Sequence, residues 1–178
     1  YDGHLYLLYF DGEQSTLINH GGRKIKDLEL LKESDQLLKG KCKDVVLAGE
    51  LYLHKEGERS RSFDLASALD DNHKDIQFKV FDILILDVVE KNYKIKELND
   101  KLNELLKGGK SISAIENSFV ESRKDIDSLF QDIVVKESEE GIVVQSDNGP
   151  TYKIKPLITL DAVVVGFSEG EGRRENKL

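Results

Sequence analysis

The stretch LYLLYFDGEQSTLIN, residues 5–19, decides the fold class of this chain. An apolar, aromatic run over residues 5–10 and a β-prone run over residues 15–19 flank the dipeptide Asp11-Gly12. Asp-Gly between two β-prone runs is a good signal for a tight hairpin. The sequence therefore predicts an antiparallel pair of strands near its start.

The rest of the chain mixes further strands with helices. Apolar runs predict strands at residues 45–53, 78–86, 112–120, 141–144, 152–155 and 162–166. Apolar residues at helical spacing predict helices at residues 26–38, 63–69, 95–106 and 126–134. Regular βαβ alternation, the Gly-x-Gly-x-x-Gly pattern and the P-loop pattern are all absent. We therefore expect an α+β fold with two largely antiparallel sheets flanked by helices.

Composition bounds the class of protein. The chain has 178 residues, 39% of them hydrophobic, which is ordinary for a soluble protein with a real core. A formal net charge of −8 argues against a surface dedicated to coating nucleic acid, although a local basic groove is compatible with it. The single cysteine, Cys42, excludes a disulfide framework within the chain. We expect an intracellular protein, in the cytoplasm or in a eukaryotic nucleus, with no membrane partner.

Four short segments combine charged residues with an apolar strand. They centre on Glu50, on Asp82, on Glu140 and on the pair Lys153 and Lys155. Side chains alternate along a strand, so the two lysines face the same way and call for anionic partners. A phosphate, or the carboxylates of Glu50 and Glu140, would supply those partners. A nucleotide–metal site needs carboxylates that bind a hard divalent cation and lysines that bind phosphate. Each of these segments alone, however, usually belongs to a solvent-exposed face of a strand.

Taken together and in order, these segments resemble the adenylation domain of ATP-dependent DNA ligases, in the covalent nucleotidyltransferase superfamily. The matching segments are Tyr1-Asp2-Gly3, Ala48-Gly49-Glu50-Leu51, Val80-Phe81-Asp82-Ile83-Leu84, Glu140-Gly141-Ile142-Val143-Val144 and Tyr152-Lys153-Ile154-Lys155-Pro156. Residues 161–166, followed by residues 169–173, resemble the start of the OB-fold domain that follows in DNA ligases. The resemblance implies an adenylation domain over residues 1–157 and a truncated OB-fold domain over residues 158–178.

The resemblance also implies a chemistry. Tyr1-Asp2-Gly3 would be the end of a Lys-x-Asp-Gly motif, so we expect a lysine just before Tyr1 and a chain that is a fragment. That lysine would attack the α-phosphorus of ATP and release pyrophosphate, forming lysyl-AMP. AMP would then pass to the 5′-phosphate of a nick in duplex DNA, and the 3′-hydroxyl would displace it. ATP, Mg²⁺ or Mn²⁺, and nicked DNA are the implied ligands of an enzyme that we expect to be a monomer.

Roles for individual residues follow from the same resemblance. ATP would be bound by seven residues: Tyr1, Gly3, Glu50, Phe81, Glu140, Lys153 and Lys155. Phe81 would stack on the adenine, although an aromatic residue in an apolar strand more often belongs to the core. Glu50 would contact the ribose or a metal-bound water, and Glu140 would help to bind the metal. The catalytic residues Lys153 and Lys155 would hold the α-phosphate and stabilise its developing charge.

Some positions depart from the family pattern. The family often has Arg at the position of Leu5, and Lys at the position of Gln145. The segment expected to contact DNA falls at residues 19–22, where His20 stands in place of the usual Arg. His20 and Arg23 are therefore the candidate DNA-binding residues.

Two alternative functions stay open at this point. An RNA ligase or a capping-type guanylyltransferase is supported by Leu5 and His20. A non-catalytic nucleotide-binding module would be favoured if the residue before Tyr1 were not lysine.

Overall fold

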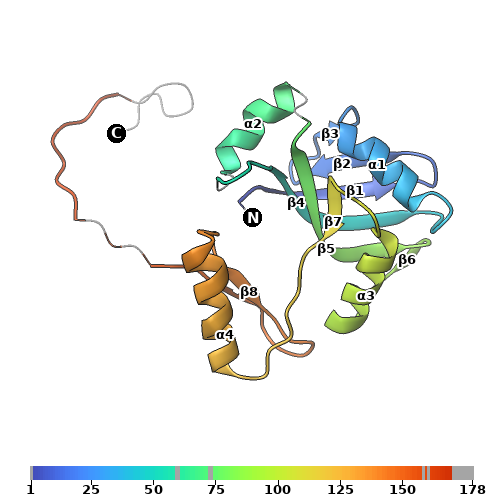
Figure 1. Cartoon of the computed structure of the whole chain (residues 1–178). Helices are drawn as coiled ribbons and strands as arrows, with labels where there is room; N and C mark the ends of the chain where they lie inside the picture. Colours follow the sequence, from blue (N-terminus) through green and yellow to red (C-terminus); the bar gives the residue numbers. More distant parts are fainter. Residues whose placement is uncertain (1, 59–60, 72–73, 158, 160, 170–178) are drawn as a thin grey trace.

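The computed structural model describes residues 2–58, 61–71, 74–157, 159 and 161–169. Tyr1, a predicted ATP-binding residue, lies outside the described part of the chain. Residues 170–173, which were predicted to belong to the start of an OB-fold domain, also lie outside it. The fold is α+β, with two sheets, as the sequence predicts (Figure 1).

The large sheet provides the framework of the molecule. Its strands are β1 (His4–Phe10), β2 (Ser15–Asn19), β3 (Lys24–Ile25), β4 (Val45–Leu53), β5 (Ile76–Leu86), β6 (Val89–Glu90) and β7 (Ile112–Ala114). The strand order is β3-β2-β1-β4-β5-β6, and neighbours along this path are antiparallel. Strand β7 pairs with β5 in the parallel direction. The predicted hairpin is β1 and β2, which pair from Tyr6 opposite Asn19 to Phe10 opposite Ser15.

Three helices contribute to the same hydrophobic core as one face of this sheet. They are α1 (Glu29–Leu38), α2 (Ser62–Asp70) and α3 (Ile95–Leu105). The sheet contributes alternate residues, which share a face because side chains of a strand point to opposite faces in turn. Among these are Leu8, Leu47, Leu51, Phe78 and Val80, all buried. We call the opposite side of the large sheet the open face.

A smaller unit follows strand β7. It comprises α4 (Arg123–Phe130), the π-helix η1 (Gln131–Lys136), β8 (Ile142–Val144) and β9 (Tyr152–Ile154). Strands β8 and β9 form a two-stranded antiparallel sheet. Ser122 caps α4: its Oγ accepts the backbone N–H of Asp125, and the Asp125 carboxylate accepts the N–H of Ser122. In Figure 1, the segment after β7 joins the large sheet to α4 and β8.

Several predicted boundaries needed correction. The helices predicted at residues 26–38 and 126–134 are α1, which begins at Glu29, and α4 continued by η1. The strand predicted over residues 112–120 ends at Ala114, and the two-residue strands β3 and β6 were not predicted. The strand predicted at residues 162–166 is absent from the described part of the chain. Its residues Val163, Val164 and Val165 are at least 85% exposed, and a strand forms only where a neighbour can take its hydrogen bonds.

No helix within the described residues is long and apolar enough to cross a membrane. The second domain predicted over residues 158–178 stays a prediction.

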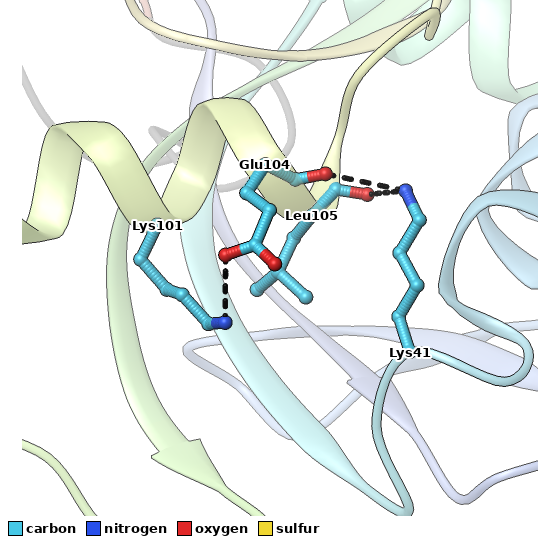
Figure 2. Close-up of polar contacts among 4 residues, drawn as sticks. All are labelled: Lys41, Lys101, Glu104 and Leu105. Atoms are coloured by element: carbon cyan, nitrogen blue, oxygen red, sulfur yellow. Dashed lines mark hydrogen bonds and ion pairs between the residues drawn. The ribbon is translucent and has the colours of Figure 1, made fainter.

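The end of α3 is held by a lysine from another part of the chain. The Nζ atom of Lys41 donates to the carbonyl oxygen of Leu105 at 2.7 Å and to that of Glu104 at 3.3 Å (Figure 2). The carboxylate of Glu104 pairs separately with Lys101 at 2.8 Å. The last carbonyls of a helix have no partners within the helix, and a cation there also opposes the negative end of the helix dipole.

Replacing Lys41 by methionine should therefore lower the free energy of unfolding by about 1 kcal/mol. Urea unfolding at an unchanged m-value would measure this loss. Lys96→Met is the matched control, because it removes the same charge from the first turn of α3, where a cation is unfavourable. Equal destabilisation by both variants would contradict the capping role of Lys41.

Candidate functional site

One row of side chains crosses the open face of the large sheet. Leu5 on β1 lies opposite Glu50 on β4, and Glu50 lies opposite Lys79 on β5. Residues directly opposite in antiparallel strands share a face, with Cβ atoms about 5 Å apart. The register therefore places a carboxylate between an apolar side chain and a cation, away from the helices.

Glu50 also fixes the start of strand β1. Its Oε1 atom accepts a hydrogen bond from the backbone N–H of Gly3 at 2.8 Å. Position 3 needs glycine, because a Cβ atom there would lie 2.2 Å from the carbonyl oxygen of Leu51. Of the predicted ATP-binding residues, Gly3 and Glu50 are thus brought together by a direct contact.

A cavity of about 250 Å³ opens beside this contact. The described residues that line it are Asp2, Tyr52, His54, Lys55, Glu58, Gln77, Lys79 and Glu139. They come from the start of the chain, from β4 and the loop after it, from β5, and from the segment that leads into β8. Segments far apart in the sequence therefore meet around one hollow.

Polar contacts fix two parts of the cavity wall. The hydroxyl of Tyr52 donates to Oε1 of Gln77 at 2.8 Å, across the pair of strands β4 and β5. Lys55 forms an ion pair with Asp64 of α2 at 2.7 Å. The hydrogen bond from Lys55 holds the pKa of Asp64 below its ordinary value. The positive charge of Lys55 is therefore already matched by a carboxylate.

Phe81 occupies an irregular place in strand β5. The register passes from Gly49 opposite Val80 to Ala48 opposite Asp82, so Phe81 is the extra residue of a β-bulge. Its side chain is 39% exposed, whereas Phe78 in the same strand is fully buried. The bulge keeps an aromatic ring out of the core, and the ring can therefore serve as a stacking surface.

The smaller sheet carries the remaining predicted residues. Lys155 forms an ion pair with Glu140, so the predicted meeting of these two groups occurs in the structure. Lys153 lies opposite Val143 and is exposed. Glu140 is thus the expected anionic partner of one lysine of the pair, Lys155.

The predicted DNA-binding residues lie elsewhere. His20 and Arg23 are both exposed in the turn between β2 and β3. Asn19 shapes this turn: its Oδ1 atom accepts the N–H of Gly21 at 3.0 Å and that of Arg23 at 2.9 Å. In the strand order, β1 lies between β2 and β4, so this turn is separated by one strand from the strands β4 and β5 that line the cavity.

A metal would need ligands beyond the protein. Within the described residues, no group of three or more His, Cys, Asp or Glu side chains could hold a metal ion alone. Mg²⁺ is commonly held by one or two carboxylates together with substrate phosphates. Glu50 and Glu140 fit that pattern as carboxylate donors, so they fit a metal that arrives with a nucleotide.

Several residues of the cavity wall were not predicted from the sequence. None of the predicted site residues in the described part of the chain lines the cavity, but three lining residues are their direct neighbours. Asp2 precedes Gly3, Lys79 faces Glu50 across the sheet, and Glu139 precedes Glu140. Asp2 belonged to a recognised motif and could have been named, whereas Lys79 could be found only from the strand register.

Comparison with known proteins identifies the family. The family described as "ATP dependent DNA ligase domain" matches residues 1–156 of this chain. No curated protein matches the chain.

Solved structures share the fold at low sequence identity. The chain is similar to the structure named Pmar-Lig_PreS3, with a TM-score of 0.70 and 20% identity over 98% of this chain and 45% of that one. A structure from work on DNA binding by Lig E DNA ligases has a TM-score of 0.65 and 15% identity over 98% of this chain and 67% of that one. The ligase domain of M. tuberculosis LigD has a TM-score of 0.54 and 21% identity over 86% of this chain and 48% of that one.

The chain thus spans about half the length of several of these structures. The family match covers nearly all of the sequence, and it agrees with the order of the motifs and with the two-sheet fold. The chain therefore belongs to the ATP-dependent DNA ligase domain family.

Proposed function

We propose that this chain is the adenylation part of an ATP-dependent DNA ligase that forms lysyl-AMP and passes AMP to the 5′-phosphate of a nick. The observation that carries this proposal is the cavity beside the contact between Gly3 and Glu50. Asp2, Lys79 and Glu139 reach that cavity from three separate segments. Polar groups that converge from separate segments can orient a polar ligand such as a nucleotide.

The nucleophile would be a lysine immediately before Tyr1. Its Nζ atom attacks the α-phosphorus of ATP, a nitrogen–phosphorus bond forms, the bond to pyrophosphate breaks, and the amine loses a proton. The nearby bond from Gly3 to Glu50 fixes the backbone two residues downstream of Tyr1. A fixed backbone holds the nucleophile in one place, which favours an in-line attack.

The nucleoside would lie against the open face of the large sheet. Glu50 contacts the ribose and Phe81 stacks on the adenine. The half-exposed ring of Phe81 supports this role, because a ring in the core could not reach a ligand. A ribose hydroxyl can share the Glu50 carboxylate with the Gly3 N–H, since a carboxylate accepts several hydrogen bonds.

The phosphates would be held from the smaller sheet. Lys153 and Lys155 bind the α-phosphate, and Glu140 takes part in binding the metal together with Glu50. The ion pair with Glu140 supports this arrangement, because it orients Lys155 before a ligand arrives. When bound, Mg²⁺ or Mn²⁺ supplies positive charge that stabilises the phosphoryl oxygens.

His20 and Arg23 would contact the DNA backbone. Both are exposed on one turn, and that turn is shaped by Asn19. A formal net charge of −8 opposes the approach of a DNA duplex to this chain as a whole. Tight binding to nicked DNA is therefore a property we assign to the whole ligase.

The decisive experiment uses the protein with its upstream residues through the expected lysine. Incubation with ATP labelled at the α-phosphate and with Mg²⁺ should give an acid-labile protein–AMP adduct. Absence of the adduct would refute the proposal.

Substrate competition separates the alternatives within the superfamily. A ligase of the proposed kind seals nicked DNA in preference to nicked RNA and takes its label from ATP. Labelling from GTP alone would assign capping chemistry, and preferential sealing of RNA would assign an RNA ligase.

A further inference from the structure

We propose that Lys79 is a further nucleotide-binding residue, which holds a phosphate oxygen of the nucleotide next to Glu50. This inference rests on the proposed function, and its test below has a separate readout. Lys79 was not recognised as a site residue from the sequence, because a single lysine in a strand usually belongs to a solvated face. The position of Lys79 in the sheet, opposite Glu50, indicates a role in ligand binding instead.

The strand register places Lys79 beside the ribose contact. Lys79 lies directly opposite Glu50, so the two side chains share the open face at a Cβ separation of about 5 Å. A group bound at Glu50 through its ribose carries its first phosphate only a few bonds away. The ammonium group on the flexible stem of Lys79 can reach that phosphate.

The cavity gives the same lysine access to a ligand. Lys79 is half-buried in the sheet and lines the cavity together with Asp2. Asp2 is two residues from the expected nucleophilic lysine, next to which the α-phosphate has to lie during the proposed reaction. Lys79 therefore lies on the path between the ribose contact and the reacting phosphorus.

The described part of the cavity wall carries charges of both signs. Its acidic groups are Asp2, Glu58 and Glu139, and each repels a phosphate. Lys55 forms an ion pair with Asp64 of α2 at 2.7 Å. Lys79 brings positive charge to the wall directly opposite Glu50, where a phosphate of the bound nucleotide would lie.

Leu5 offers a second position for a positive charge beside Glu50. Leu5 lies on the other side of Glu50 in the same row, on β1, and its side chain is 54% exposed. An arginine at this position would reach over the same carboxylate from the opposite side. A charge placed at position 5 should therefore partly replace a charge removed from position 79.

The test measures the binding of AMP and of adenosine, which differ only in the phosphate. Isothermal titration of each ligand uses the wild-type protein and Lys79→Met, at low ionic strength. We expect Lys79→Met to raise the Kd for AMP about 10-fold, as for the loss of one hydrogen bond to a charged group, and to leave the Kd for adenosine unchanged. Lys79→Arg should retain AMP binding within about threefold, because it keeps the charge.

Two further variants make the test specific. Leu5→Arg combined with Lys79→Met should recover part of the lost AMP affinity. Lys32→Met is the matched control, because it removes an exposed lysine of α1 that pairs with Glu29, and both affinities should stay unchanged. Lys79→Gln replaces Lys79→Met if circular dichroism shows that the latter is unfolded.

The outcomes are distinguishable from those of the proposed function. Equal weakening of AMP and adenosine by Lys79→Met would overturn the inference, since it would assign Lys79 a purely structural role. Wild-type protein that binds AMP no more tightly than adenosine would overturn it as well. Formation of the protein–AMP adduct is a separate measurement, and its failure would refute the ligase chemistry.

Discussion

Replacing Phe78 by alanine is expected to lower the free energy of unfolding by about 3–5 kcal/mol. The Phe78 ring is fully buried in the core cluster. On β5 it lies opposite Leu51 of β4 and Ile112 of β7, so it connects three strands. It also packs against Gly49, where an added Cβ atom would lie 2.6 Å from the ring. Because glycine has no side chain to move into the space, the variant should keep a cavity.

Urea unfolding measured by circular dichroism would give the free energy of unfolding of this variant. Phe63→Ala is the matched control, because its side chain is 72% exposed and its loss should change stability by at most about 0.5 kcal/mol. A loss below about 1 kcal/mol for Phe78→Ala would contradict the central place of this ring in the core.

Replacing Glu50 by alanine should slow formation of the protein–AMP adduct by about 100-fold. The variant removes the acceptor that holds the N–H of Gly3 at 2.8 Å, so the expected nucleophile loses its fixed position. It also removes the proposed ribose contact. Single-turnover labelling with ATP, on protein that contains the upstream lysine, would measure the rate.

The Glu50→Gln variant distinguishes two roles of Glu50: holding the backbone of Gly3 and supplying a negative charge. Glutamine keeps an oxygen acceptor for Gly3 but loses the negative charge. A small decrease in rate for this variant would assign the main role of Glu50 to holding the backbone. A decrease as large as that of Glu50→Ala would assign it to the charge. Unchanged labelling by Glu50→Ala would contradict both roles.

The long elements could be predicted from the sequence because their patterns are local. The hairpin of β1 and β2 was readable from Asp11-Gly12 and from the runs on each side of it. Helix α3 was readable from its spaced leucines and from the glycines after it. The strands β3 and β6 have two residues each, which is too short for any period to be seen.

The site could be predicted only in part, because a motif names a residue and not its neighbours. Glu50 and Gly3 were both named, but their hydrogen bond depends on how β1 pairs with β4. Lys79 could not be named at all, because its pairing with Glu50 depends on a strand register that joins two residues 29 positions apart in the sequence. Phe81 was named through the family resemblance, since its place in an apolar strand favours the core.

The bulge at Phe81 matters for attempts to increase the thermal stability of this protein. Deletion of one residue at this position would restore regular pairing between β4 and β5 across Ala48 and Gly49. The sheet would become more uniform, and a selection for thermostability alone would favour such variants. The same deletion would remove the half-exposed ring from the open face. Stability and nucleotide recognition should therefore compete for this one position, and engineering of the strand should leave the irregularity in place.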